Sequence, residues 1–370
     1  MPISTGSLFI VLFLLIILGL IEAMMHKSAI SKIPIRIHVN GTRGKSSVTR
    51  LIAAGLRIGG IKTFAKTTGS SPRFIDDYGN DHIIQRFRPA SIGEQIRMIG
   101  RFSKQSPRAI VMECMAVQPQ YQWVSEHRIL QSNYGVITNV RADHLEEMGY
   151  SLNHIAKSLS NTIPYNQKFF TSDVDCSYLL EDKAKENNSE FNLSNGGNLD
   201  SKYLQGFSFI EHPDNIALAL DVCREIGVKK EVAIKGMRSM IPDSGALTIT
   251  SLLINNSKVD FVNAFAANDP QSTLKTWNII SAYVKDDNKK IAIFLNTRSD
   301  RQLRTQQLLD MIFSKMEVDY LIVRGNNLDN GIQLRCKNIK VIEYSVFEDK
   351  DNASKIIDRI SRLDDYLVVG

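Results

Sequence analysis

The segment Gly41-Thr42-Arg43-Gly44-Lys45-Ser46-Ser47 lies between an apolar, β-branched run at residues 35–39 and a helix-compatible run at residues 48–58. A glycine loop between a strand and a helix presents backbone N–H groups to anions, and the helix N-terminus adds its positive dipole end. In such loops the lysine contacts the β- and γ-phosphates of a nucleotide, and the next hydroxyl reaches Mg²⁺. The pattern therefore predicts a nucleoside triphosphate site, with Lys45 on the phosphates and Ser46 near the metal.

The spacing of this loop is short. The common pattern is G-x-x-x-x-G-K-[ST], and Val39 stands where its first glycine would be. A lone G-K-S triplet arises by chance, but the strand and helix around it strengthen the interpretation. The alternative is an ordinary turn followed by a capped helix.

Length and composition narrow the class of protein. A chain of 370 residues holds about two domains, and its hydrophobic fraction of 43% is typical of a globular protein. The formal charge of +6 comes without a long Lys/Arg run, which favours anionic ligands and the inner membrane face and predicts no nucleic-acid partner. The four cysteines form no C-x-x-C pair, so neither a disulfide framework nor a structural zinc site is indicated.

The N-terminus is strongly apolar, with a single charge in residues 3–25. Its uninterrupted core is short for a spanning helix, which needs about 20 residues. A secretory signal peptide would need a basic start and a small-residue cleavage site, and neither is evident. Lys27, Lys32 and Arg36 follow the segment and no Lys or Arg precedes it, so the positive-inside rule places the body in the cytoplasm. We predict a membrane anchor at residues 1–28, in a single-pass protein of the cell membrane.

Beyond the loop, strand-like and helix-like patterns alternate, which predicts an α/β fold with a mostly parallel sheet. Functional side chains then gather at the carboxyl ends of the strands. The polar stretch 187–201 is interpreted as a surface loop, and a polar break at 255–258 separates the predicted domains 29–254 and 255–370. Further strands are predicted at 109–112, 134–140, 168–171, 261–265, 291–295, 320–323, 341–344 and 366–370, and further helices at 215–226 and 272–284.

The chain ends on the strand pattern at residues 366–370. A βα domain rarely needs to end on a strand. We therefore expect that a last helix is missing after Gly370, or that the chain is truncated.

Four later segments carry side chains suited to a nucleotide site. Glu113 follows a buried strand, where its carboxylate is suited to Mg²⁺, and Asp143-His144 follows the next strand. Ser71 precedes a proline in a loop, and Asn215 begins a helix, where it is suited to an adenine edge. Each has a plainer alternative: a solvated carboxylate, a capping or packing histidine, a turn serine and a helix cap.

Together, and in this order, the segments resemble the Mur ligase superfamily, which includes folylpolyglutamate synthase. That superfamily has a G-T-x-G-K-[ST] loop, an S-P turn, a glutamate after a strand, an N…D-H segment and an H-x-x-N helix start. This sequence has Gly41-Thr42-Arg43-Gly44-Lys45-Ser46, Ser71-Pro72, Glu113, Asn139…Asp143-His144 and His212-Pro213-Asp214-Asn215.

A narrower resemblance, from about residue 30 to the end, is to the CapB/PgsB family of poly-γ-glutamate synthase subunits. It implies a P-loop Mur-ligase-like central ATPase domain and a smaller Rossmann-like C-terminal domain, preceded by one transmembrane helix. Besides the phosphate loop and the membrane segment, it is carried by Ile92-Gly93-Glu94-Gln95, Glu113-Cys114-Met115-Ala116-Val117, Ala266-Ala267-Asn268-Asp269 and Thr297-Arg298-Ser299-Asp300-Arg301.

The resemblance implies an ADP-forming, ATP-dependent amide ligase at the cytoplasmic membrane face. ATP would convert a glutamate γ-carboxylate into an acyl phosphate, which the amino group of a second glutamate attacks. The implied cofactors are ATP and Mg²⁺. The implied partners are glutamate, the poly-γ-glutamate chain, the membrane and a small integral-membrane subunit of the CapC/PgsC type; homo-oligomerisation stays open.

The resemblance also implies roles for individual residues. Arg298 and Arg301 are expected to grip a glutamate carboxylate or the anionic chain, for which the guanidinium fork is suited; the alternative is a solvated loop. The implied catalytic residues are Lys45, Glu113, His144, Arg298 and Arg301. The implied metal ligands are Ser46, Ser71, Glu113 and His144. The implied nucleotide-binding residues are Gly41, Thr42, Arg43, Gly44, Lys45, Ser46, Ser47, Asn215, Asn268 and Asp269.

The sequence departs from the superfamily pattern in three places. Pro242-Asp243-Ser244-Gly245-Ala246 stands for the P-G-R segment and lacks its arginine. Lys157 lies near the position of the carbamylated lysine of several Mur ligases, without a clear match. The membrane segment stands where that superfamily has a separate substrate domain, which argues against ligation of cell-wall precursors.

Other functions fit parts of the pattern. A folylpolyglutamate or Mur-type ligase on a soluble acceptor is disfavoured by the membrane segment. A GTPase-like switch needs an N-K-x-D base reader, whereas Asn288-Lys289 is followed by Lys290-Ile291. A non-catalytic nucleotide-binding subunit of a membrane complex would tolerate the loss of Glu113 and His144, yet both are present.

Overall fold

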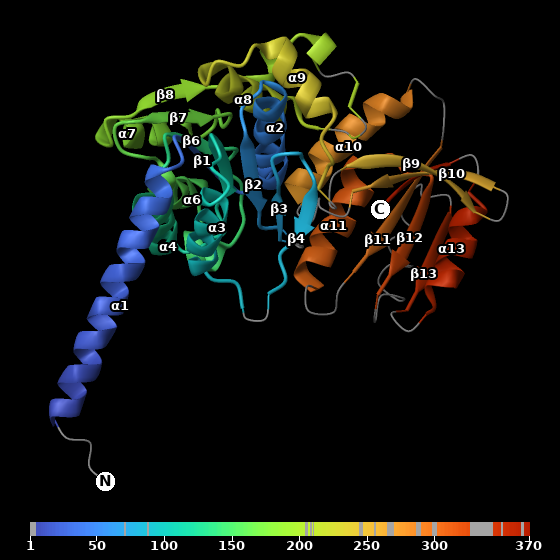
Figure 1. Cartoon of the computed structure of the whole chain (residues 1–370). Helices are drawn as coiled ribbons and strands as arrows, with labels where there is room; N and C mark the ends of the chain where they lie inside the picture. Colours follow the sequence, from blue (N-terminus) through green and yellow to red (C-terminus); the bar gives the residue numbers. More distant parts are fainter. Residues whose placement is uncertain are drawn as a thin grey trace. The chain divides into compact units, whose positions relative to one another are not determined.

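The computed structural model in Figure 1 places two α/β sheets in two units. The N-terminal unit comprises Met1–Phe207 and Glu211–Asp243, and the C-terminal unit comprises Ser208–Ile210 and Ser244–Gly370. The residues that the structure describes are 5–69, 72–86, 89–203, 206–207, 209, 211–243, 247–254, 257–264, 270–285, 290–297, 302–325, 343–348, 351–363 and 366–370.

The sheet of the N-terminal unit has the order β4-β3-β2-β5-β1-β6-β7-β8. The strands β2, β5, β1, β6, β7 and β8 are parallel, so their carboxyl ends lie at one edge of the sheet. β3 pairs antiparallel with β2, and β4 pairs antiparallel with β3. The strands are β1 (Ile35–Asn40), β2 (Thr63–Thr67), β3 (Arg73–Ile75), β4 (Asp81–Ile83), β5 (Ala109–Glu113), β6 (Tyr134–Ile137), β7 (Lys168–Thr171) and β8 (Glu190–Leu193).

Helices pack around this sheet in groups. Helix α2 packs against α8 and α9, while α3 packs against α1 and the π-helix η1. The helices are α1 (Thr5–Ser31), α2 (Lys45–Ile58), α3 (Gly93–Ser103), α4 (Pro119–Val124), η1 (Ser125–Leu130), α5 (Leu145–Met148), α6 (Leu152–Leu159), α7 (Ser177–Glu186), α8 (Pro213–Glu225) and α9 (Lys230–Arg238), with 3₁₀ turns η2 (Ser160–Thr162), η3 (Gly196–Asn198) and η4 (Ser201–Tyr203).

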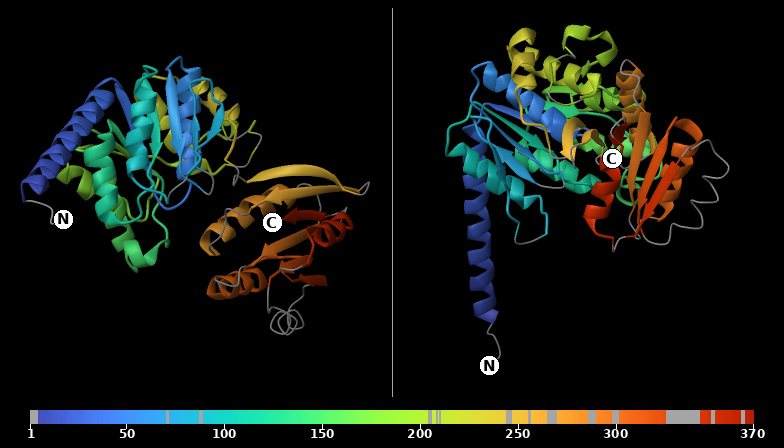
Figure 2. Two further views of the ribbon diagram at one scale, coloured as in Figure 1. Left: turned by 60° about the horizontal axis from the view of Figure 1, so that its bottom comes forward. Right: turned by 90° about the vertical axis from the view of Figure 1, so that its right-hand side faces the viewer.

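Helix α1 projects beyond the sheet and its covering helices (Figures 1 and 2). Within the described residues, Leu8–Ser31 is the one helical stretch long and apolar enough to cross a membrane, and none of its most apolar part is buried. The last turn of this helix and the residues after it behave differently, because Ala29, Ile30 and Ile33 are buried in a cluster with Phe102 of α3. The end of the apolar helix is therefore part of the hydrophobic core of the unit.

The C-terminal unit has its own sheet, of order β13-β12-β11-β14-β10-β9. β9 runs antiparallel to its neighbour β10, and the other strand pairs of the described residues are parallel. One core cluster includes Trp277 of α10 and Leu309 of α11, and a second includes Ile356 and Ile360 of α13. The elements are β9 (Thr248–Ile254), β10 (Ser257–Asn263), α10 (Pro270–Lys285), β11 (Lys290–Asn296), α11 (Gln302–Lys315), β12 (Tyr320–Arg324), β13 (Glu343–Phe347), α13 (Ala353–Ser361) and β14 (Tyr366–Val369).

The α/β class and the strand and helix predictions on described residues are confirmed, with shifts of a few residues at their ends. The prediction of a loop at 187–201 is wrong, because β8 and η3 lie within it. β8 is a partly exposed edge strand of four residues, whose polar–apolar alternation is too short to stand out within the polar stretch. The predicted domain boundary after residue 254 stays a prediction; β9, which precedes it, pairs with β10 in the C-terminal sheet.

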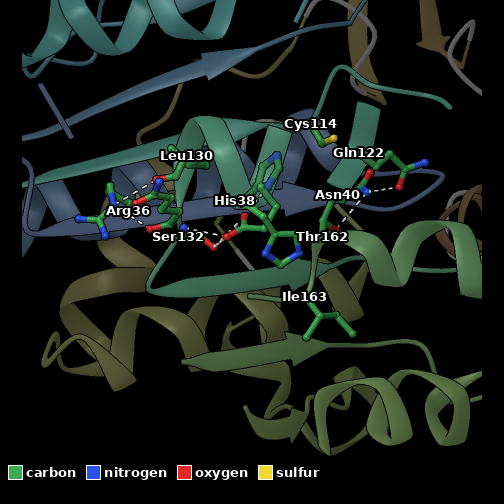
Figure 3. Close-up of polar contacts among 12 residues, drawn as sticks. Arg36, His38, Asn40, Cys114, Gln122, Leu130, Ser132, Thr162 and Ile163 are labelled. Atoms are coloured by element: carbon green, nitrogen blue, oxygen red, sulfur yellow. Dashed lines mark hydrogen bonds and ion pairs between the residues drawn. The ribbon is translucent and has the colours of Figure 1, made fainter. Parts of the chain in front are cut away.

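The central strand β1 has an unusually polar face. Arg36, His38 and Asn40 alternate along the strand, which puts their side chains on one side of the sheet. His38 Nδ1 lies 2.8 Å from Glu126 Oε2, and both side chains are 1% exposed (Figure 3). Asn40 Nδ2 donates to Gln122 Oε1 at 3.0 Å. Because β1 runs directly into the phosphate loop, these bonds fix the start of that loop.

The buried contact between His38 and Glu126 favours the protonated form of His38 in the folded state. Burial by itself lowers the pKa of His38, but contacts with Cys114 and Glu126 outweigh it and raise the pKa to about 10. Glu126 is held from its other side by the Ser132 backbone N–H, at 2.8 Å. The folded state therefore binds the His38 proton more tightly than the unfolded chain, whose histidine has a pKa near 6.5.

We predict that the stability of the full chain in detergent falls as the pH rises from about 6.5 to about 10. The raised pKa of His38 gives a stabilisation that is complete below the unfolded value and is lost as the pH passes the folded value. Urea unfolding at a series of pH values measures this slope. His38→Gln should remove it, whereas His154→Gln, at an exposed histidine, should leave it in place. An unchanged slope in His38→Gln contradicts the assignment.

Candidate nucleotide site

The phosphate loop has a backbone that only glycine adopts at two positions. Gly41 has φ +129°, and a Cβ there would lie 2.1 Å from Thr138 Oγ1. Gly44 has φ +78° at the N-cap of α2, and a Cβ there would lie 2.9 Å from the amide of Asn215. Both left-handed conformations and both close approaches exclude a side chain. The two glycines thus bring the loop against β6 and α8.

The carboxyl end of β6 holds the outside of this loop. Asn139 Oδ1 accepts from Thr42 Oγ1 at 2.8 Å and from the Arg43 backbone N–H at 3.1 Å. Asn139 Nδ2 and Thr138 Oγ1 both donate to the Arg43 carbonyl, at 3.0 and 2.6 Å. The loop is therefore fixed by side chains about 95 residues away in the sequence, a preorganised arrangement suited to holding an anion.

Lys45 and the first turn of α2 face the inside of the loop. Lys45 Nζ donates to the carbonyls of Gly41 and Thr42, at 2.7 and 3.3 Å. The first N–H groups of a helix have no partner within the helix, and the first turn of α2 contains no acidic residue that would compete for them. An ammonium group, free backbone donors and the positive helix end thus lie together, as a phosphate site requires.

Glu113 joins three elements at the edge of the sheet. Its side chain is buried at the end of β5, with 2% of the residue exposed. Glu113 Oε2 accepts from Ser46 Oγ of α2 at 2.9 Å and from the Thr68 backbone N–H, just after β2, at 2.7 Å. A hydroxyl and a carboxylate in contact beside a phosphate loop are the oxygen donors that Mg²⁺ prefers.

Asn215 lies against the loop rather than away from it. Its Nδ2 donates to Glu211 Oε1 at 2.7 Å, and its amide fills the space that a Cβ on Gly44 would need. Burial raises the pKa of Glu211, while hydrogen bonds from Asn215, the His212 backbone and Ser47 oppose that rise. Glu211, which precedes α8, therefore links Asn215 of α8 to the start of α2. The contact of Asn215 with a nucleotide base stays a prediction.

A second acidic side chain, that of Asp243, lies beside Gly69, just after β2. A Cβ placed on Gly69 would lie 3.4 Å from both Asp243 Oδ2 and Ser46 Oγ. Asp243 Oδ1 lies 3.5 Å from Arg50, which is 3% exposed and also binds Asp81 at 2.8 Å. Asp243 belongs to the segment that stands for the P-G-R segment of the superfamily. Its carboxylate, held by the buried Arg50, lies at the edge of the site.

The structure does not bring His144 to this cluster. His144 has φ +45° at the N-cap of α5, its side chain is 49% exposed, and its Nδ1 lies 3.9 Å from Glu147 Oε2. Across the described residues, no group of three or more His, Cys, Asp or Glu side chains is arranged to hold a metal ion. Lys157 is exposed on α6. The role of His144 as a metal ligand stays a prediction.

The remaining predicted residues lie outside the described residues. These are Ser71, Asn268, Asp269, Arg298 and Arg301.

Sequence reasoning missed three side chains of the site. Each stands beside a motif that it did identify: Thr138 directly precedes Asn139, Glu211 directly precedes His212, and Asp243 follows Pro242. Their positions in the sequence were therefore visible. Their contacts were not, because they reach across elements far apart in the chain.

We predict that Gly41→Ala abolishes nucleotide binding, because its Cβ would displace the Thr138 hydroxyl from the Arg43 carbonyl. Gly60→Ala is the matched control: Gly60 also has a positive φ, +82°, but open space around it. It should cost about 1–3 kcal/mol of stability through backbone strain and leave binding intact. Calorimetric titration with ADP measures both. Wild-type affinity in Gly41→Ala would contradict this account of the loop.

Comparisons with known proteins identify the family of this chain. Residues 39–238 match the Mur ligase middle domain, and residues 249–370 match the poly-gamma-glutamate synthase CapB C-terminal domain. The chain is 37% identical over 319 residues to the PGA synthase CapB of Bacillus subtilis strain 168, covering 85% of this chain and 80% of that protein. It is 36% identical over 313 residues to the capsule biosynthesis protein CapB of Bacillus anthracis, covering 84% and 67%.

Solved structures share the fold at low identity. FolC of E. coli in complex with ADP has a TM-score of 0.67 and 14% identity, covering 94% of this chain and 89% of that chain. The bifunctional folylpolyglutamate synthase/dihydrofolate synthase of Yersinia pestis, complexed with AMPPNP and Mn, has a TM-score of 0.64, 14% identity and the same coverage. With the two domain matches and the relatives above, this chain belongs to the CapB family of poly-γ-glutamate synthases and carries a Mur ligase middle domain.

Proposed function

We propose that this chain is an ATP-dependent amide ligase that forms γ-glutamyl bonds in poly-γ-glutamate synthesis, releasing ADP. The observation that carries the proposal is the contact of Glu113 with Ser46 and Thr68 beside the phosphate loop. Membership of this chain in the CapB family supports the same reaction. A carboxylate is a poor acylating agent, so the γ-carboxylate of one glutamate takes the terminal phosphoryl group of ATP. The amino group of the next glutamate then attacks the acyl phosphate, and phosphate leaves as the amide bond forms.

The residues of the loop bind and orient the nucleotide. Phosphoryl transfer is catalysed chiefly by positioning and by fixed positive groups around the transferring phosphoryl. Lys45 and the N–H groups at the start of α2 supply those groups, and Asn139 holds the loop in place. With phosphates bound, we expect Lys45 to exchange its contacts with the Gly41 and Thr42 carbonyls for contacts with phosphate oxygens.

The donors around Glu113 fit a divalent metal ion. The Ser46 hydroxyl and the Glu113 carboxylate are oxygen ligands in direct contact, and a structural neighbour was solved with Mn. We propose that Ser46 and Glu113 hold Mg²⁺, with Ser71 and His144 as the further ligands that the family resemblance implies. When bound, the ion neutralises charge on the phosphates.

Substrate and partner assignments extend the proposal to the C-terminal unit. Arg298 and Arg301 are proposed to bind a glutamate carboxylate or the growing chain, and Asn268 and Asp269 to lie near ATP. The chemistry of the two arginines supports their role, because a guanidinium fork pairs with a carboxylate through two hydrogen bonds. A small integral-membrane subunit of the CapC/PgsC type is the proposed partner.

The apolar surface of α1, and the Lys and Arg residues that follow its apolar part, support a membrane location with the body in the cytoplasm. The exposed apolar side chains between Leu8 and Met25 suit a lipid environment. A secretory signal peptide would need a basic start and a small-residue cleavage site, and neither is evident in this segment. We therefore propose that α1 is a retained, single-pass anchor.

We predict that Lys45→Ala and Glu113→Gln each lower turnover by about 10²–10³-fold, as expected for the loss of a fixed charge or ligand at a transferring phosphoryl group. Membranes carrying the full chain and its partner subunits are assayed for glutamate-dependent ADP, phosphate and γ-linked polymer. Lys104→Ala and Glu186→Gln, at exposed side chains, are the matched controls. Release of AMP and pyrophosphate would exclude the acyl-phosphate route, and normal turnover in Lys45→Ala would exclude the site.

We predict that deletion of residues 1–25 moves a folded body into the soluble fraction, because it removes the exposed apolar turns of α1 and keeps Ala29, Ile30 and Ile33. Deletion of residues 1–34 is the control. It strips these side chains from the core, and each fully buried isoleucine contributes about 1.5–3 kcal/mol, so this variant should unfold. Fractionation and circular dichroism measure the two outcomes. If the 1–25 deletion stays in the membrane, α1 is not the main tether.

A further inference from the structure

The first turn of α3 carries two buried polar side chains that the site described above does not use. Glu94 and Gln95 are 5% and 3% exposed. They belong to the Ile92-Gly93-Glu94-Gln95 segment, to which the sequence assigned no role. Polar side chains at such burial are costly unless they are paired, so their partners indicate what they do.

Gln95 holds the end of β5. Its Nε2 donates to the backbone carbonyl of Glu113 at 3.0 Å. The carboxylate of the same residue is bound by Ser46 and Thr68. Glu113 is therefore fixed at its main chain by α3 and at its side chain by α2 and the residue after β2.

Glu94 holds the end of β2. Its Oε1 lies 2.9 Å from Lys66 Nζ, and Lys66 is fully buried two positions before Thr68. Arg86 binds the same carboxylate through Nε at 2.7 Å and through a terminal nitrogen at 3.0 Å. Burial alone would raise the pKa of Glu94, but the contacts with Arg86 and Lys66 outweigh it and lower the pKa to about 2. The charge on Glu94 thus persists at any physiological pH.

A contribution to stability does not by itself explain the buried charged and polar side chains of Glu94, Gln95 and Lys66. The surrounding side chains, including Phe64, Phe102 and Met112, form an apolar core. A buried ion pair in such a place contributes little net stability compared with apolar side chains of similar volume. Among the described residues, Gln95 Oε1 and Thr67 Oγ1 are also buried without a hydrogen-bond partner. A geometric role accounts for polar groups that packing does not need.

We propose that Glu94 and Gln95 are positioning residues of the nucleotide site. The first turn of α3 ties together the carboxyl ends of β2 and β5, and so sets the separation between Thr68, Glu113 and Ser46. The inference rests on the proposed function, since it assigns to these two residues the placement of the Glu113 carboxylate as a metal ligand. It goes beyond that function by naming side chains that touch neither nucleotide nor metal.

The test compares metal dependence with stability in the full-length chain, purified in detergent. Binding of AMPPNP is titrated at increasing Mg²⁺ concentration, and the melting temperature of each variant is measured alongside. Gln95→Met removes the donor to Glu113 at nearly constant volume and should weaken the apparent Mg²⁺ affinity about 10–100-fold, the range for residues that orient metal ligands. Ile99→Ala, at a fully buried position of the same helix, is the control. It should lower the melting temperature at least as much and leave the Mg²⁺ affinity unchanged.

A double variant separates charge from folding. Glu94→Gln alone leaves the Lys66 ammonium buried with its partner neutral, so it should lose stability as well as Mg²⁺ affinity. Adding Lys66→Met removes the buried charge and should restore the melting temperature while the Mg²⁺ affinity stays weakened. Wild-type Mg²⁺ affinity in Gln95→Met or in the double variant would overturn the inference. If the wild-type chain itself binds AMPPNP without any dependence on Mg²⁺, the proposed metal site fails instead.

Discussion

The arrangement of the site depends on the Glu113 carboxylate, which joins Ser46 of α2 and Thr68 of the β2 end. A buried carboxylate is tolerated only when it is well partnered, so three elements have to meet within hydrogen-bond distance of one another. The glycines at positions 41 and 44 let the chain turn sharply enough to bring the start of α2 to that point. The position of the phosphate loop and the position of the Glu113 side chain therefore depend on each other.

Two layers of buried polar side chains surround this junction. On one, His38 and Asn40 of β1 bind partners on η1 and α4, at the strand that leads into the loop. On the other, Glu94 and Gln95 of α3 bind the ends of β2 and β5. Apolar side chains would fill the same volume at lower cost. These buried polar contacts hold the phosphate loop and Glu113 at fixed positions, at a cost in stability compared with apolar packing.

Local sequence was sufficient for the parts of the fold that local physics determines. The strand before Gly41 and the helix after it followed from apolar runs and from glycine, and the end of the sheet at which Glu113 lies followed from the rule for parallel strands. The failure at residues 187–201 has the same origin. β8 is stabilised by its ladder with β7 at the sheet edge, and its polar–apolar alternation spans only four residues within a polar stretch.

The sequence by itself determined the phosphate loop, the alternation of strands and helices, the apolar N-terminal segment and the family, because each is specified by neighbouring residues or by whole motifs. Only the tertiary structure decided which side chains meet. It placed Thr138 and Asn139 on the Arg43 carbonyl, Asp243 on Arg50, and Gln95 on Glu113, and it left His144 exposed. Periodicity and spacing specify which face of an element is buried. They carry no information on which distant hydrogen-bond partner that face will find, since the partner is chosen by how the packed elements align.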